Sequence, residues 1–84
     1  MYIVVGSVTT ATRLARLLER NLGVPVSVSH TPAAIKSGGC SYSARISGVS
    51  ADRVRNIADN YKINIKSIYA EEFSDGERVY RDIS

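Results

Sequence analysis

Hydrophobic positions along this chain follow two different periods, and each change of period marks an expected element. Residues 2–6 form a short apolar run rich in β-branched side chains, typical of a strand buried on both faces. Leucines and alanines recur at helical spacing over residues 11–22, which predicts an amphipathic helix. Hydroxyl residues at 7–10 supply candidate N-caps and Gly23 a left-handed C-cap. Valines alternating over residues 24–28, with a proline near the start, predict an edge strand.

The second half of the chain repeats this order after a loop rich in breaker residues. Residues 40–46 alternate as in a strand, and residues 51–61 return to helical spacing. A further strand is expected over residues 63–69. Asp75 and Gly76 lie between two β-rich segments, which is a hairpin signal, so a last strand is expected just after them.

The predicted order is strand, helix, strand, strand, helix, strand, which is the βαββαβ pattern of a ferredoxin-like α+β sandwich. Its antiparallel sheet carries both helices on one face, with the first and third strands central. The two halves also echo each other about forty residues apart, so that Tyr2 aligns with Tyr42. We expect one domain over residues 1–84, with a core over about 2–70 and a C-terminal hairpin or flexible tail over 71–84.

Composition places the chain among globular proteins and narrows its partners. Hydrophobic residues make up 44% and charged residues 23% of the 84 positions, which excludes disordered and low-complexity classes. The net charge of +3 comes from scattered basic residues without the dense stripe that phosphate backbones attract, so no nucleic-acid partner is expected. No apolar run approaches the ~20 residues that span a bilayer, so no membrane association is expected.

A single cysteine, Cys40, limits the redox and metal chemistry of the chain. One cysteine forms no intrachain disulfide, and with one histidine it cannot complete a structural zinc site. We therefore expect no metal, no cofactor and a reducing, cytoplasmic location.

Cys40 is also the strongest nucleophile candidate, because it follows a loop whose backbone N–H groups could face a thiolate. The loop residues before it are Ser37, Gly38 and Gly39. Positive charge or N–H donors favour the thiolate, which attacks sulfane sulfur readily. The candidate positive neighbours in sequence are Lys36, His30 and Arg45. The alternative is a small buried hydrophobe, since Cys40 alternates in phase with apolar residues of the following strand.

Weaker signals have ordinary structural interpretations. Acidic Glu71, Glu72 and Asp75 are expected on a polar hairpin, where they serve solubility. Tyr2 and Tyr42 lie on the strands where RNA-recognition domains place stacking aromatics, but the basic-Gly-aromatic string of those domains is absent. Core packing is therefore the preferred interpretation of both tyrosines.

The first strand is apolar on both faces, so the sheet face away from the helices needs a cover. A second copy of the chain is the simplest cover, because two-fold dimers dominate soluble oligomers. This favours an alternative function, namely a dimeric regulatory or assembly module that binds a partner protein or small ligand.

The order of motifs resembles the selenium/sulfur carrier-like family. The motifs are the β-rich start at residues 2–5, the Gly-Val-Pro-Val run at 23–26, Thr31-Pro32, the Ser/Gly loop that ends at Cys40, and Ile68-Tyr69. The resemblance covers about residues 2–70 and implies a bacterial carrier linked to sulfurtransferases and selenium metabolism. Relatives often carry Cys-Gly, whereas here Ser41 follows the cysteine and the glycines precede it.

The resulting hypothesis is a carrier of sulfane sulfur or selenium through the thiol of Cys40, rather than a complete enzyme. A desulfurase-like donor and a downstream acceptor are the implied partners. The expected binding residues are Thr31, Pro32, Lys36, Ser37, Gly38 and Gly39.

Overall fold

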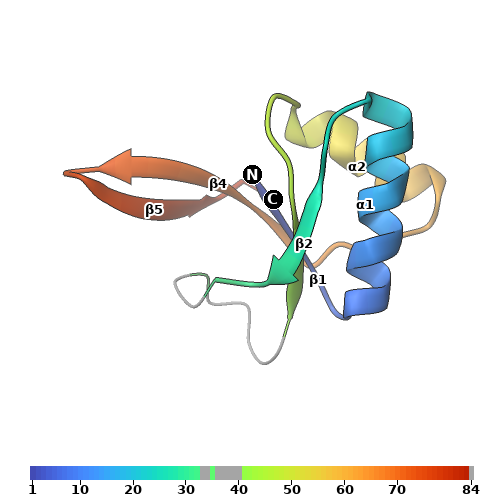
Figure 1. Ribbon diagram of the computed structural model, residues 1–84, viewed down its shortest axis with the longest axis horizontal. Coiled ribbons are helices and arrows are strands. Elements are labelled where there is room, and N and C mark those ends of the chain that lie inside the picture. Colours follow the sequence, from blue (N-terminus) through green and yellow to red (C-terminus); the bar gives the residue numbers. More distant parts are fainter. Residues whose placement is uncertain (33–34, 36–40, 84) are drawn as a thin grey trace.

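The computed structural model describes residues 1–32, 35 and 41–83, which form one five-stranded antiparallel sheet with two helices on one face (Figure 1). The elements are β1 (Tyr2–Val5), α1 (Val8–Leu22), β2 (Ser27–His30), β3 (Tyr42–Arg45), α2 (Ala51–Asn60), β4 (Ser67–Ser74) and β5 (Glu77–Asp82). The strand order is β2-β3-β1-β4-β5. The predicted ferredoxin-like fold is confirmed, with β5 as the additional C-terminal strand.

A serine precedes each helix as its N-cap, and α1 ends at Gly23, the C-cap that the sequence predicts. The Ser7 hydroxyl accepts a hydrogen bond of 3.2 Å from the Thr10 amide at the start of α1. Gly23 ends this helix at a φ of 69°, and its amide donates to the Glu19 carbonyl at 2.9 Å. Ser50 caps α2 in the same way as Ser7 caps α1. Neither described helix has the length and apolarity needed to cross a membrane.

The main core lies between the helices and the sheet. Leu14 and Leu18 of α1 are completely buried against Ile3 and Val5 of β1 and neighbouring apolar residues of the sheet. The smaller helix α2 adds Val54 and Ala58 to this cluster. This packing fixes which face of each strand is apolar, because successive side chains of a strand point to opposite faces.

The hairpin of β4 and β5 projects away from the helices (Figure 1). Its two-residue turn places Asp75 at a φ of 52° and Gly76 at 78°, the left-handed pair that a type I′ turn requires. The strand before it starts at Ser67, later than the alternation from residue 63 predicts. Lys62 has a φ of 57° and the Ile63 amide bonds back to the Ala58 carbonyl, so Ile63 enters the core from the turn that ends α2.

The second face of the sheet is covered within this chain. Tyr2 and Val4 of β1 form a separate buried cluster with Ile35, and Tyr69 and Tyr80 pack against its border. The expectation that something covers this face is therefore met by Ile35 and by the hairpin tyrosines. Formation of a homodimer stays a prediction, but this covered face no longer requires one.

The two aromatic residues at aligned positions of the chain's halves lie on opposite faces. Tyr42 pairs with Val5 and packs against the main core, whereas Tyr2 pairs with Arg45 and faces the second cluster. They therefore cannot form a common stacking platform. The forty-residue repeat aligns the helices but places the strands one residue out of phase.

Candidate functional site

The connection between β2 and β3 leaves the sheet through a closed neck of hydroxyl groups, formed by Thr31, Ser41 and Ser43 and called here the loop neck. The Thr31 amide donates to the Ser41 carbonyl at 3.1 Å, which extends the ladder by one pair beyond His30 and Tyr42. The Ser41 hydroxyl donates to the Thr31 hydroxyl at 2.9 Å, and Thr31 and Ser43 share a hydrogen bond of 2.7 Å between their hydroxyls. The two ends of the connection are thus fixed to each other.

The hydroxyl groups of the two serines in the loop neck are buried. Ser43 is fully buried and Ser41 is only 4% exposed, on the strand face that alternation leaves polar. A buried hydroxyl without a partner is costly, so each must find a hydrogen bond within the protein. Thr31 supplies this partner to both serines through one oxygen, which explains why a threonine suits the position before Pro32.

Ile35 anchors the same connection to the second face of the sheet. Its amide donates to the Pro32 carbonyl at 2.9 Å, and its side chain is 4% exposed. The side chain packs with Tyr2 and Val4, the latter completely buried. The apolar anchor and the loop neck together hold both the entry and the exit of the connection.

Of the residues predicted for the site, the structure describes only two. Thr31 belongs to the loop neck, and Pro32 directly after it accepts the hydrogen bond from the Ile35 amide. The others lie outside the described residues, namely Lys36, Ser37, Gly38, Gly39 and Cys40. Their predicted roles therefore stay predictions.

His30 and Arg45, the two described residues proposed as neighbours of the thiol, have other contacts. The centroids of the His30 and Tyr42 rings are 4.6 Å apart. These two side chains lie on one face of the sheet, and the Thr31 side chain lies on the opposite face. Arg45 Nη2 is 3.0 Å from Glu71 Oε1, and its guanidinium lies 5.6 Å from the Tyr2 ring centroid. The charge of Arg45 is thus largely occupied by a carboxylate on β4.

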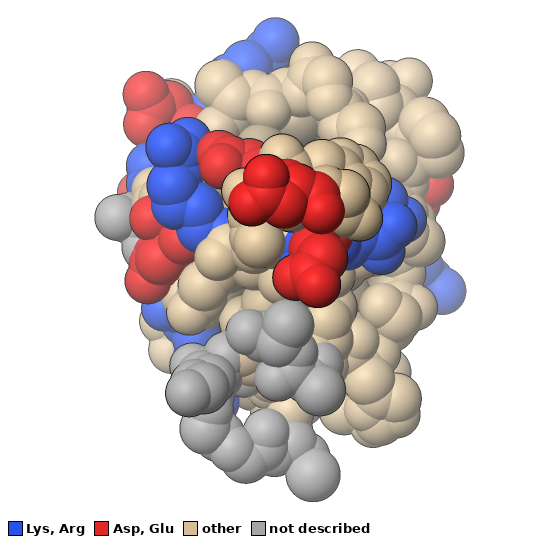
Figure 2. Space-filling view, turned by 90° about the vertical axis from the view of Figure 1, so that its left-hand side faces the viewer, with Lys and Arg blue, Asp and Glu red and all other residues tan. Residues whose placement is uncertain are grey.

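Glu71 is the polar residue whose role the sequence analysis missed. It was expected to serve solubility, yet its side chain is only 13% exposed and lies between two arginines. In addition to the Arg45 contact, Arg78 Nε lies 2.9 Å from Glu71 Oε2. These two atoms form an ion pair, but their geometry is not that of a hydrogen bond. Acidic and basic side chains stand beside each other on this hairpin side of the molecule (Figure 2). The register of β4 opposite β5 brings Arg78 beside Glu71, and the pairing of β3 and β4 with β1 brings Arg45 there. Local patterning reveals neither contact.

Tyr2 borders this charged cluster and titrates differently from a free tyrosine. Burial, assisted by the negative charge of Glu71, raises the pKa of Tyr2 above its ordinary value. Its ring meets that of Tyr80 edge to face, with centroids 5.4 Å apart. The cluster is a structural support for the second face.

Among described residues, no group of three or more histidine, cysteine or acidic side chains could hold a metal ion.

These features define a small ferredoxin-like α+β protein with an anchored connection between its second and third strands. The chain belongs to the family described as "Putative Se/S carrier protein-like", which it matches over residues 1–70. The resemblance noted from the motifs is thereby confirmed, and the family's description associates the chain with selenium or sulfur carriage. No curated protein and no solved structure matches the chain.

Proposed function

We propose that this protein carries sulfane sulfur or selenium on the thiol of Cys40, in the cytoplasm, between a desulfurase-like donor and an acceptor protein. The observation that carries the proposal is the family match over residues 1–70, a span that contains the only cysteine of the chain. A persulfide or its selenium analogue needs a thiol, so no other side chain in this sequence can hold the cargo.

The transfer itself is an exchange without net oxidation. The Cys40 thiolate attacks the terminal sulfur of a donor cysteine persulfide, and a new sulfur–sulfur bond forms at Cys40. The donor's sulfur–sulfur bond breaks, and the donor cysteine leaves as a thiolate with the bonding electron pair. The proton of the terminal sulfur stays on that atom. Delivery to the acceptor repeats the same exchange with Cys40 as the leaving thiolate.

The described residues support this proposal by fixing the segment that contains the cysteine at both ends. Ser41, the next residue after Cys40, is buried and hydrogen bonded within the loop neck. Ile35 holds the segment's first part against the sheet. A nucleophile on a loop between two fixed points can be presented to partners without loss of the fold, which is a common arrangement for functional residues.

The remaining predicted residues then assist the thiolate. The charge of Lys36 and the backbone N–H groups of Ser37, Gly38 and Gly39 favour the anionic sulfur over the neutral thiol. Thr31 and Pro32 set the direction in which the segment leaves the sheet. In this proposal the loop supplies the chemistry, while the sheet and helices supply its support.

A reconstituted transfer assay tests the proposal. The protein is incubated with a cysteine desulfurase and cysteine, and intact-mass spectrometry measures the gain of one sulfur atom per chain. We expect loading of the natural chain and none of Cys40→Ser. The matched control is the double variant Cys40→Ser with Ser47→Cys, which moves the thiol to an exposed position outside the connection.

Equal sulfur loading of the control and the natural chain would refute the proposal, because any exposed thiol would then accept the sulfur atom. Alkylation of the folded protein gives a second check. Reaction of Cys40 only after unfolding would identify a buried hydrophobe instead of a carrier thiol.

A further inference from the structure

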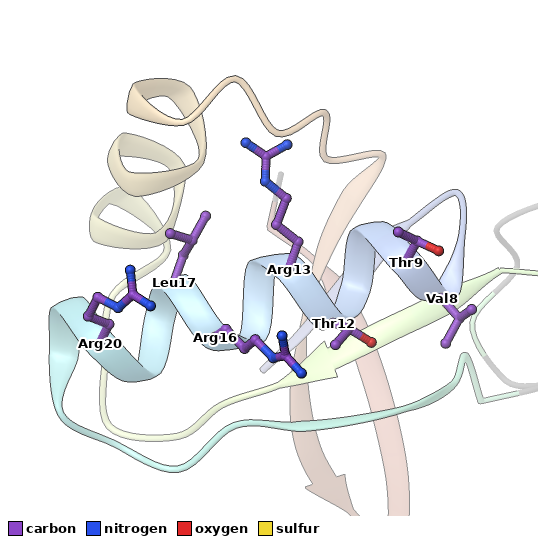
Figure 3. Close-up of a pocket in the computed structure, with 7 residues that line it drawn as sticks. All are labelled: Val8, Thr9, Thr12, Arg13, Arg16, Leu17 and Arg20. Atoms are coloured by element: carbon purple, nitrogen blue, oxygen red, sulfur yellow. The ribbon is translucent and has the colours of Figure 1, made fainter.

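A shallow groove of about 480 Å³ follows the outer side of α1 (Figure 3). Its lining residues are Val8, Thr9, Thr12, Arg13, Arg16, Leu17 and Arg20. The labelled side chains run from Val8 and Thr9 at the start of the helix to Arg20 near its end. Leu17 turns toward α2 and gives the groove an apolar floor, and Val8 is 47% exposed at its open end. We call this surface the arginine groove.

The three arginines of the groove are exposed and have no acidic partner within the described part of the chain. The four ion pairs found there use Arg45, Arg55, Arg78 and Arg81. Arg13 makes only a long hydrogen bond of 3.4 Å to the Tyr61 carbonyl. Thr9 and Arg13 also border an adjacent hollow that includes Lys62. Neither lining contains a carboxylate, so this side of the molecule presents uncompensated positive charge.

This arrangement is unfavourable for the isolated helix. Arg13 and Arg16 are three residues apart and Arg16 and Arg20 four apart, the spacings at which like charges on a helix repel. Four of the chain's eight acidic residues lie on β4 and β5 and a fifth, Asp75, lies in the turn between them, whereas α1 contains only Glu19. The arginine groove is therefore a positively charged surface that complements an acidic partner.

We propose that the arginine groove docks an acidic segment of a partner protein, with carboxylates on the arginines and an apolar side chain over Leu17. This inference rests on the proposed function, and the partner is the donor or acceptor protein of the carrier. Arg13 and Arg20 are seven residues apart, about 10 Å along the helix axis, which matches acidic residues two turns apart on a partner helix. The groove has no aromatic side chain on which a nucleic-acid base could stack.

The groove also leads to the appropriate end of the sheet. Val5, three residues before α1, pairs with Tyr42, and Tyr42 pairs with His30. The start of α1 and the loop neck therefore lie at the same end. A partner held along the groove reaches the end of the sheet where the connection that contains Cys40 in sequence leaves β2 and returns to β3.

Fluorescence anisotropy tests the docking directly. The probe is a fluorescein-labelled helical peptide with two glutamates on each of two successive turns, spaced as the groove arginines are, around one leucine. We expect Arg16→Glu and Arg20→Glu each to weaken binding at least about fivefold, and added salt to weaken binding to the natural chain, because exposed charges are screened. The matched control is Arg53→Glu on α2, an exposed arginine outside the groove that makes the same change of net charge and should bind as the natural chain does.

Three outcomes would overturn the proposal. The peptide fails to bind, or all three variants weaken binding equally, or oligo(U) of similar length binds more tightly and its binding is lost in the groove variants. Sedimentation in the absence of peptide tests whether a second copy of the chain occupies the groove. Self-association that Arg16→Glu abolishes would assign the groove to that copy and overturn the proposal as well. Loading of Cys40 by inorganic polysulfide needs no docking partner. Its failure would refute the carrier function, whereas failure of peptide binding would refute only the groove.

Discussion

Replacing Ile35 by alanine tests whether the connection between β2 and β3 is anchored to the sheet. Ile35 is 4% exposed and covers Val4, which is completely buried on a face with no helix. Buried isoleucine-to-alanine changes cost about 2–5 kcal/mol through lost burial and the cavity left behind. Because Ile35 belongs to a small cluster of three buried residues rather than to the main core, we expect the lower end, about 2 kcal/mol, in the free energy of unfolding.

Urea unfolding followed by circular dichroism measures this difference. Val79→Ala is the matched control, since Val79 is 39% exposed on the hairpin and its truncation should cost less than about 0.5 kcal/mol. A loss below about 0.5 kcal/mol for Ile35→Ala as well would show that the side chain is not held against Tyr2 and Val4. The anchoring argument would then be refuted.

Three further predictions concern the hairpin and the second face. Glu71→Gln removes the negative charge that pairs with two arginines in a partly buried site and should cost about 1 kcal/mol, whereas the exposed Glu77→Gln should cost almost nothing in the same urea assay. Gly76→Ala should cost about 1 kcal/mol at its φ of 78°, while Gly6→Ala, whose added Cβ would lie 3.7 Å from a lysine methylene, should be neutral within about 0.5 kcal/mol. The raised pKa of Tyr2 means that the unfolded chain ionises first, so the free energy of unfolding should fall as pH rises above 10.0. This fall should be smaller in Tyr2→Phe, and identical pH profiles would contradict the burial argument.

The helices and the central strand were predictable because their signals are local. The two helices are specified by apolar residues at helical spacing, by a serine before each helix and by Gly23 after the first one. None of these signals depends on the segments against which the helices pack. The turn at Asp75 and Gly76 specifies the hairpin in the same way. Each of these features depends on neighbours within a few residues, which the sequence displays directly.

The second face was not predictable because its contacts join distant segments. Ile35 lies in a stretch rich in breaker residues whose apolar positions follow no strand or helix period, yet it covers Val4. Ser43 alternates as a solvent-facing residue but is completely buried beside Thr31. The sequence likewise predicts a surface carboxylate at Glu71, but the pairing of β3, β1, β4 and β5 places it between two arginines. Tertiary cover, rather than strand pattern, decides the burial of these residues.

Docking and loop anchoring use opposite layers of the same small fold, and this separation has a testable consequence. The arginine groove lies on α1, which packs on one face of the sheet, whereas Ile35 lies on the other face. Because the two sites share no contact, the effects of Arg16→Glu and Ile35→Ala on the logarithm of the sulfur-transfer rate should add in the double variant. A double variant far from additivity would mean that the partner contacts both layers at once. Additivity would mean that a carrier of this size recognises its partner with one layer and holds its reactive segment with the other.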